Sequence, residues 1–219
     1  MLKAVNIHKS YNKLHVLKGI DLEVSEGEIV SIVGASGAGK STLLHILGTL
    51  DRPDTGSVSI KDTTLENLSE EKLAQFRNQN IGFVFQFHNL LPEFTAYENI
   101  CLPAMIGNRN MNEIQEKADY LMNMLGIYHR KNHKPSEMSG GEQQRTAVAR
   151  ALINSPVIIF ADEPSGNLDS KNAEELHRLF FKLRQDLKQT FVIVTHNFHL
   201  ADMADRKVEI IDGKIGNGI

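Results

Sequence analysis

The stretch EIVSIVGASGAGKSTLLHIL, residues 28–47, decides the fold of this chain. Its first six residues form a short, mainly apolar run typical of a β-strand, and Lys40 to Leu47 have the pattern of a helix. Residues 34–41 lie between them and follow G-x-x-x-x-G-K-[ST], in the strand–loop–helix context that this motif requires. The sequence therefore predicts a phosphate-binding loop.

This loop has the chemistry to hold a nucleoside triphosphate. Its glycines let the backbone curl so that successive N–H groups face a phosphate, and the following helix adds the positive end of its dipole. Lys40 can reach the β and γ phosphates, and the Ser41 hydroxyl can ligate Mg²⁺. We expect nucleotide contacts from consecutive residues, namely Gly34, Ala35, Ser36, Gly37, Ala38, Gly39, Lys40, Ser41 and Thr42.

The rest of the chain predicts an α/β fold. Apolar and polar residues alternate up to Val24, as in antiparallel strands with one buried face. Further strands are expected at 56–60, 81–85, 157–161 and 191–195, helices at 68–78, 172–187 and from 198, and a last hairpin at 212–213. Residues 94–153 are helical in period, with breaks at Pro103, Gly107, Gly126 and Pro135. We expect one domain, residues 1–219, in which a P-loop NTPase core of mixed parallel sheet is flanked by helices, with antiparallel N-terminal strands and a helical insert at about 88–155.

The composition argues against several classes of function. The chain has 219 residues and a net charge of −3, so no attraction to nucleic acid is expected. Its single cysteine, Cys101, cannot form an intrachain disulfide, which fits a reducing compartment. The first residues have no apolar core of signal-peptide length, and no run of about 18 apolar residues occurs, so no direct membrane insertion is expected.

A carboxylate pair, Asp162-Glu163, directly follows the apolar run at 157–161. At the carboxyl end of a buried strand, Asp162 can hold the hydration shell of Mg²⁺ while Glu163 faces the γ phosphate and polarises a water. The alternative is a helix N-terminal cap, which such pairs often provide. Beside a phosphate-binding loop, the catalytic interpretation is favoured.

A second anion-binding element is predicted at residues 139–143, Ser-Gly-Gly-Glu-Gln. Ser139 is a good helix N-cap, and Glu142 suits the first turn. The adjacent glycines, Gly140 and Gly141, cost backbone entropy unless something must approach closely, and an anion at the helix start is the natural candidate. Either one nucleotide is wrapped by both elements of the same chain, or each chain offers its second element to a nucleotide held by a partner.

Six motifs occur in a fixed order: residues 34–41, Gln86, residues 139–143, Asp162-Glu163, residues 165–169 and His196. Their order and spacing resemble those of an ABC-type ATPase domain over essentially the whole chain. The resemblance implies an ATPase with ATP and Mg²⁺ as cofactors and a homodimer as its working form. Two residues depart from the family pattern. Glu142 stands where the commonest form has Gln directly after the second Gly, and Asn197 follows His196 where the family usually has Asp.

The resemblance also implies roles for single residues. Tyr11 is similar to the aromatic residue that stacks on adenine, His196 to the switch histidine, and Asp169 to the end of the loop that lines the dimer interface. The signature that binds the γ phosphate of the other protomer's ATP corresponds to Ser139, Gly140, Gly141, Glu142 and Gln143. The implied catalytic residues are Glu163, His196, Lys40 and Gln86, and the implied metal ligands are Ser41, Gln86 and Asp162.

Three stretches indicate a branch of the family. Residues 47–53, 87–103 and 166–169 closely resemble the lipoprotein-release (Lol-type) ATPases, and macrolide-efflux and cell-division ATPases share part of this pattern. The resemblance implies a free-standing subunit, bound to integral membrane permeases at the cytoplasmic face of the inner membrane. The alternatives are an efflux ATPase, an ATP-dependent scaffold of the cell-division type, and a P-loop kinase with both anion sites around one nucleotide.

Overall fold

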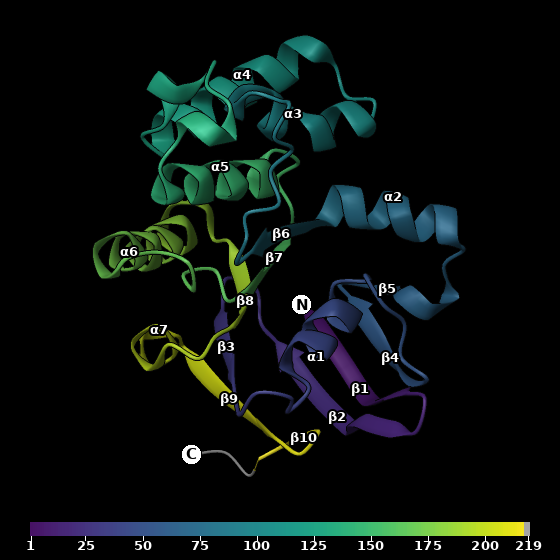
Figure 1. Cartoon of the computed structure of the whole chain (residues 1–219). Helices are drawn as coiled ribbons and strands as arrows, with labels where there is room; N and C mark the ends of the chain where they lie inside the picture. Colours follow the sequence, from purple (N-terminus) through teal and green to yellow (C-terminus); the bar gives the residue numbers. More distant parts are fainter. Residues whose placement is uncertain (217–219) are drawn as a thin grey trace. The chain divides into compact units, whose positions relative to one another are not determined.

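The computed structural model describes residues 1–216 and confirms the α/β prediction (Figure 1). The chain divides into two units, one of residues 1–74 with 184–216 and one of residues 75–183. It passes from one unit to the other within α2 (Glu70–Asn80) and again within α6 (Ser170–Leu187).

The first unit contains the predicted antiparallel N-terminal sheet. Its strands are β1 (Leu2–Tyr11), β2 (Leu14–Val24), β4 (Thr55–Ile60) and β5 (Thr63–Thr64), in the order β2-β1-β4-β5. Leu2, Ala4 and Ile7 of β1 are buried, and the alternation of buried and exposed residues is interrupted between Ala4 and Ile7, where the pairing register with β2 shifts. The alternation in the sequence therefore marks the core face of this sheet. A short 3₁₀ turn, η1 (Leu65–Asn67), follows β5.

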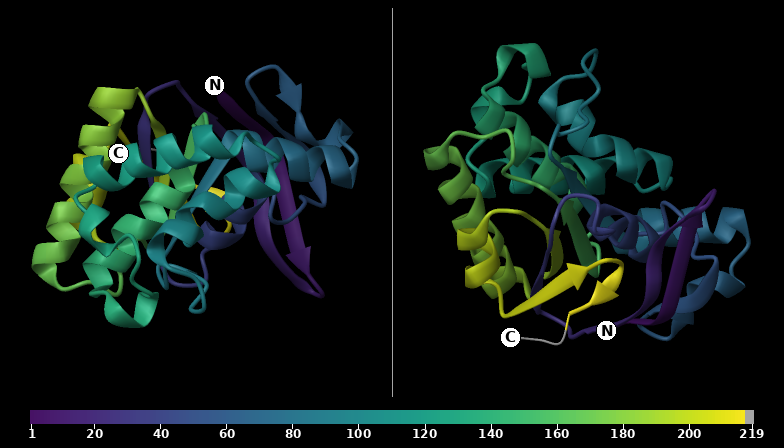
Figure 2. Two further views of the ribbon diagram at one scale, coloured as in Figure 1. Left: turned by 90° about the horizontal axis from the view of Figure 1, so that it is seen from above. Right: turned by 60° about the horizontal axis from the view of Figure 1, so that its bottom comes forward.

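Parallel strands form the rest of the first unit's core. Strand β3 (Ile29–Val33) lies between β8 (Thr190–Val194) and β9 (Arg206–Ile211), and β10 (Lys214–Ile215) pairs antiparallel with β9. Every residue of β8 is buried, as expected for a strand covered on both faces. Helix α1 (Lys40–Leu47) contacts β8, and α7 (Phe198–Met203) contacts β3. The β9–β10 hairpin, yellow in the right panel of Figure 2, is tied to β2 because Lys18 N–H donates to the Gly213 carbonyl.

The second unit combines a parallel strand pair with helices. Strand β6 (Ile81–Phe85) pairs with β7 (Ile158–Asp162) so that Phe85 lies opposite Asp162. Helix α5 (Gly140–Leu152) packs on β6, and α3 (Ala96–Ile106) and α4 (Met111–Met124) pack on α5, teal to green in Figure 2. Two 3₁₀ turns, η2 (Tyr128–Arg130) and η3 (Pro135–Glu137), connect α4 to α5. The predicted helical insert at about 88–155 falls inside this unit. That it forms a subdomain of its own stays a prediction.

One predicted break is wrong. Pro103 lies inside α3, which continues to Ile106 and ends at Gly107. A proline fixes φ near the helical value and removes only one N–H donor, so a helix held by tertiary contacts can contain it. The Pro103 carbonyl is bonded twice, by the Gly107 N–H at 3.1 Å and by the Asn78 Nδ2 at 2.9 Å.

Within residues 1–216, none of the helices combines the length and the apolar character that crossing a membrane requires.

Candidate functional site

The predicted phosphate-binding loop connects β3 to α1 in the first unit. Gly34, Gly37 and Gly39 have φ values of 147°, 80° and 105°, which other residues adopt only with strain. These values turn the chain so that α1 begins at Lys40. The Lys40 ammonium donates to the carbonyls of Gly34 and Ala35, at 2.9 Å each, so it lies across the loop's own backbone. Loop and helix thus have the form that the motif predicts.

Tyr11, the predicted adenine-stacking residue, ends β1 and is 44% exposed. Its hydroxyl donates to the Asp51 carboxylate at 2.6 Å, and the Lys9 ammonium donates to the same carboxylate at 2.7 Å. Burial acts to raise the pKa of Asp51, but the hydrogen bonds from Lys9 and Tyr11 lower it overall. An ionised Asp51 therefore holds the tip of the Tyr11 ring, while the residue stays partly exposed.

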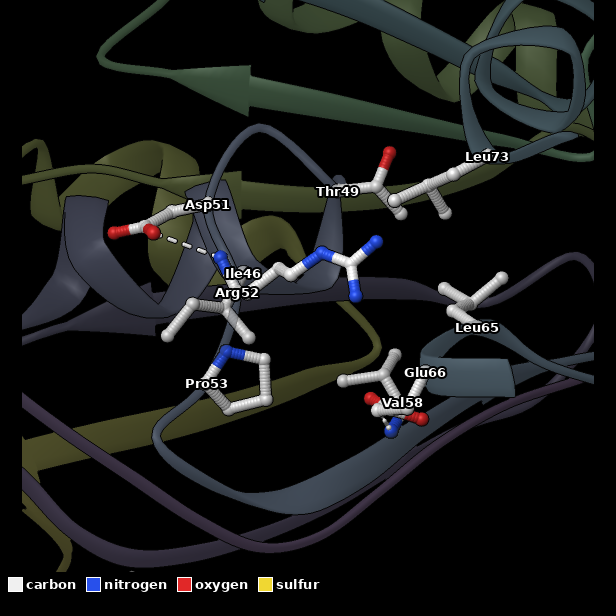
Figure 3. A pocket seen from close by; sticks show the side chains of 9 residues that line it. All are labelled: Ile46, Thr49, Asp51, Arg52, Pro53, Val58, Leu65, Glu66 and Leu73. Atoms are coloured by element: carbon white, nitrogen blue, oxygen red, sulfur yellow. Dashed lines mark hydrogen bonds between the residues drawn. The ribbon is translucent and has the colours of Figure 1, made fainter. Parts of the chain in front are cut away.

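The turn that carries Asp51 also borders a small cavity of about 90 Å³ (Figure 3). Figure 3 shows the Arg52 guanidinium extending into this cavity and Asp51 directed away from it. The remaining walls are mainly apolar, with Ile46, Pro53, Val58, Leu65 and Leu73. A second cavity, of about 370 Å³, lies between residues 35–38 and residues 209–212. Glu209 and Asp212 line it, and two carboxylates do not suit a phosphate.

His196 follows Thr195, the first residue beyond the end of β8, and is exposed. Asn197, the residue that departs from the family pattern, is the N-cap of α7, because its Oδ1 accepts from Leu200 N–H at 3.0 Å. Its own N–H donates to the Thr195 hydroxyl at 3.0 Å. Since Asn and Asp are equally good N-caps, the departure preserves the local structure that places His196.

In the second unit, Gln86 and the carboxylate pair lie at the carboxyl ends of the parallel strands β6 and β7. Gln86 follows β6, Asp162 ends β7, and the register places the ends of these strands opposite each other. The Gln86 side chain is held by Asn167: Gln86 Nε2 donates to Asn167 Oδ1 at 3.0 Å, and Asn167 Nδ2 donates to the Gln86 carbonyl at 3.2 Å. The stretch at 165–169 thus contacts the residue predicted to touch the metal.

Glu163 has an unusual backbone conformation. Its φ is 46°, in the left-handed region that non-glycine residues rarely occupy. The Gly166 N–H bonds to the Glu163 carbonyl at 3.0 Å and closes a tight turn after β7. Ten other non-glycine residues within residues 1–216 also have positive φ, so this conformation marks a tight turn and is not by itself a sign of catalysis. The helix that follows starts only at Ser170, so the pair caps no helix directly.

The predicted signature begins α5. Ser139 is the N-cap and forms a capping box with Glu142: the Ser139 hydroxyl accepts from Glu142 N–H at 3.3 Å, and Glu142 Oε2 accepts from Ser139 N–H at 2.8 Å. The Gln143 Nε2 donates to the Pro135 and Met138 carbonyls and holds the segment that leads into the helix.

The two signature glycines differ in their surroundings. A Cβ on Gly141 would lie 2.4 Å from Asn172 Oδ1, and Asn172 in turn donates to Asp169 at 2.6 Å. A Cβ on Gly140 would meet nothing closer than Leu168 Cδ2 at 3.5 Å, an ordinary contact. A side chain at 141 would therefore displace Asn172, which explains Gly141 by packing inside the chain, whereas no such contact explains Gly140. The space beside Gly140 is where a bound anion has room.

Sequence reasoning missed two residues of α5 that fix this region. Gln144 is fully buried; it accepts from His88 Nδ1–H and donates to the Pro164 carbonyl at 2.7 Å. Arg150 donates to the carbonyls of His88 and Asn89, both of which have positive φ. Burial lowers the pKa of His88, which favours its neutral form. The only sequence signal was a polar residue at a core position of a helix, which does not reveal its partner.

The predicted site residues are thus divided between the units. The first unit holds Tyr11, the loop at 34–42 and His196. The second holds Gln86, the signature at 139–143, and the pair Asp162-Glu163, and within it Gln86, Asp162 and Glu163 lie at one strand edge.

Comparison with known proteins agrees with these motifs. A family model described as ABC transporter matches residues 17–166. The lipoprotein-releasing system ATP-binding protein LolD of Cytophaga hutchinsonii is 65% identical over 215 residues, which covers 98% of each chain. The protein of the same name in Bacteroides thetaiotaomicron is 59% identical, covering 98% of this chain and 99% of the relative.

A solved structure has the same fold. It is described as a dimeric structure of a post-hydrolysis state of the ATP-binding cassette MJ0796 bound to ADP and Pi. The TM-score is 0.91 at 40% identity, over 100% of this chain and 98% of that chain.

Proposed function

Because this chain belongs to the ABC transporter family of ATP-binding proteins, we propose that it is the ATP-hydrolysing subunit of a lipoprotein-releasing system. Permease subunits that span the inner membrane hold it at the cytoplasmic face. The observation that carries this proposal is the 65% identity, over 98% of both chains, to a protein named for that system. The local sequences at 47–53, 87–103 and 166–169 support the same branch.

ATP is bound mainly by the first unit. Its phosphates accept hydrogen bonds from the N–H groups of the loop at 34–42 and from the Lys40 ammonium. To reach the phosphates, Lys40 breaks its hydrogen bonds to the Gly34 and Ala35 carbonyls. The adenine stacks on the partly exposed ring of Tyr11, whose hydroxyl stays bonded to Asp51. His196, which follows β8, holds the γ phosphate and the attacking water.

The predicted metal ligands suit Mg²⁺. A hydroxyl (Ser41), an amide (Gln86) and a carboxylate (Asp162) all offer oxygen, the donor atom that this ion prefers. When bound, the ion would neutralise charge on the β and γ phosphates.

Glu163 accepts a proton from the water that attacks the γ phosphate. The left-handed backbone at Glu163 sets the direction in which its side chain leaves the main chain. The hydrogen bond from the Gly166 N–H to the Glu163 carbonyl keeps that turn closed. Gln86, held by Asn167, couples the state of the bound nucleotide to the conformation of the residues that follow it. The first of these, Phe87, is 75% exposed. Those residues contact the permeases.

Two copies of the chain form the working unit. The open space at Gly140 and the exposed Ser139 at the start of α5 let the γ phosphate of a second copy approach the helix N-terminus. The dimeric MJ0796 cassette supports this arrangement. One nucleotide wrapped by both elements of one chain is the kinase arrangement, and no comparison favours it.

Asn167→Ala is expected to lower ATP hydrolysis about three- to tenfold, because Gln86 loses the two bonds that orient it. ATP binding should be unchanged, since the nucleotide loop lies in the first unit. Steady-state hydrolysis and equilibrium binding of a fluorescent ATP analogue measure the two effects. An unchanged rate would mean that Gln86 needs no support from Asn167.

The lipoprotein-releasing activity is tested with the chain in complex with the permeases that co-purify with it. The complex is placed in liposomes with a fluorescent lipoprotein, and release to the medium is measured with ATP or with a non-hydrolysable analogue. We expect release only with ATP, and none from a complex carrying Glu163→Gln.

Two results would contradict parts of this proposal. Hydrolysis without release would favour a scaffold of the cell-division type, and release of a macrolide instead of a lipoprotein would favour the efflux branch.

A further inference from the structure

The Glu142 carboxylate is bonded through both of its oxygens. Oε2 accepts from the Ser139 N–H at 2.8 Å and from the Ser139 hydroxyl at 3.0 Å. Oε1 accepts from Arg130 Nε at 2.8 Å and lies 3.2 Å from His129 Nε2. Burial acts to raise the pKa of Glu142, but the bonds from Arg130, Ser139 and His129 lower it to about 2. The carboxylate is therefore ionised at neutral pH.

Arg130 reaches Glu142 from a segment that is itself held in place. Its N–H donates to the carbonyl of the buried Ile127 at 2.9 Å. The next residue, Lys131, forms an ion pair with Asp119 and lies over the Tyr97 ring, 4.3 Å from its centroid. The Arg130 backbone and its neighbour Lys131 are therefore held in place, and the Arg130 guanidinium reaches Glu142 from this fixed position.

An ionised Glu142 creates a difficulty for an anion at this helix start. The N-terminus of α5 attracts negative charge, but a carboxylate in its first turn already satisfies that preference and repels a second anion. The same carboxylate also accepts a hydrogen bond from the Ser139 hydroxyl, which directs that O–H away from an approaching anion. A neutral Gln, the commonest residue of the family at this position, has no such charge. A chain with Glu142 therefore needs a counter-charge.

We propose that Arg130 is a positioning residue for the signature, supplying the positive charge that lets a helix start containing Glu142 bind the γ phosphate of ATP on a second copy of the chain. The guanidinium holds Oε1 and balances its charge, while Oε2 keeps Ser139 in the N-cap position. This inference rests on the proposed function, because it needs an ATP-bound dimer. His129 approaches the same oxygen but is 61% exposed at its side chain, against 32% for Arg130, so water screens its charge more strongly.

A purely structural role for Arg130 makes a different prediction. If the ion pair only stabilised the second unit, its loss would lower the melting temperature and leave the ATP requirement of the dimer unchanged. If it balances charge, its loss matters only while Glu142 carries a charge. The ATP requirement of the dimer, measured beside the melting temperature, separates these possibilities, and the Glu142→Gln chain tests whether the effect acts through the carboxylate.

The experiment measures ATP-driven dimer formation by size-exclusion chromatography, with all chains carrying Glu163→Gln so that bound ATP persists. Arg130→Met, which keeps the apolar stem, is expected to raise the ATP concentration for half-maximal dimer about tenfold. Arg130→Lys, which keeps the charge, should raise it less than about threefold, because only one bond to Oε1 must be replaced. Arg178→Met, which removes an exposed ion pair with Glu174 in the same unit, is the matched control and should change it less than about twofold.

The second arm repeats Arg130→Met in a chain with Glu142→Gln. In that chain, Arg130→Met should raise the ATP concentration for half-maximal dimer less than about twofold, because position 142 then has no carboxylate whose charge must be balanced. With Glu163 intact, Arg130→Met should raise KM for ATP about tenfold and change kcat less than about threefold. Thermal unfolding of every chain identifies variants that fail to fold.

The outcomes keep this inference distinct from the proposed function. A tenfold shift that persists with Glu142→Gln, or no shift at all while the parent dimer forms, overturns the role of Arg130 and leaves the ATPase assignment intact. If the Glu163→Gln parent forms no dimer at saturating ATP, both are overturned.

Discussion

Glu163→Gln is expected to reduce ATP hydrolysis at least about 100-fold while leaving ATP binding intact, because a glutamine cannot accept the proton of the attacking water. The substitution changes neither the size of the side chain nor the backbone. The left-handed turn at Glu163, closed by the Gly166 N–H, should therefore remain. ATP that is bound but not cleaved should accumulate in a dimer. Hydrolysis assays and size-exclusion chromatography in the presence of ATP measure both effects.

Glu174→Gln is the control for this prediction. Glu174 lies on α6 with a side chain 53% exposed, and its ion pair with Arg178 has no connection to the nucleotide site. This variant should hydrolyse ATP within about twofold of the parent, since exposed ion pairs contribute little. Hydrolysis at the parent rate by Glu163→Gln would show that another group is the base.

The same substitution at the two adjacent signature glycines is expected to have opposite effects. Gly141→Ala should destabilise the second unit by about 0.5–1.5 kcal/mol, because its Cβ would lie 2.4 Å from Asn172 Oδ1 and force that side chain from its hydrogen bond with Asp169. Gly140→Ala should leave the isolated chain as stable or slightly more so, since its Cβ meets only Leu168 at 3.5 Å and alanine favours a helix. Its methyl group nevertheless occupies the space that the γ phosphate of the partner needs.

We therefore expect Gly140→Ala to reduce hydrolysis about 100-fold with no loss of melting temperature. Each glycine serves as the other's control, because residue type and helix are shared. Thermal unfolding and ATPase rates of both variants test the pair. A stable Gly140→Ala chain with the parent rate would remove the argument that an anion approaches this helix start.

Local sequence patterns predicted the elements well. The strand predicted at 81–85 coincides with β6, the helix at 40–47 with α1, and the strand at 157–161 is β7 shifted by one residue. These segments are short apolar or amphipathic runs bounded by Gly, Pro or polar residues, so neighbouring residues contain the whole signal. The helix break predicted at Pro103 was wrong because the deciding signal is not local. Contacts between α3 and distant segments keep that helix continuous.

The candidate site was predicted in part. Every motif could be read from its own residues, since the phosphate-binding loop, the signature and the carboxylate pair are each continuous in the chain. The partners that orient them were not predicted. Gln144 bonds His88 from 56 residues away, Asn167 bonds Gln86 from 81, and nothing near Arg130 in the sequence indicates Glu142.

The sequence by itself determined which chemistry this protein has, because a nucleotide loop, a base and an N-capped glycine pair depend on residue types at fixed short spacing. Only the tertiary structure decided how those residues are held. It assigned Gly141 to internal packing and left Gly140 open, gave Glu163 a left-handed backbone, and set a counter-charge beside Glu142. The physical reason is that hydrogen bonds, ion pairs and steric limits act between atoms that are close in space, and packing alone brings together residues that are far apart in the chain.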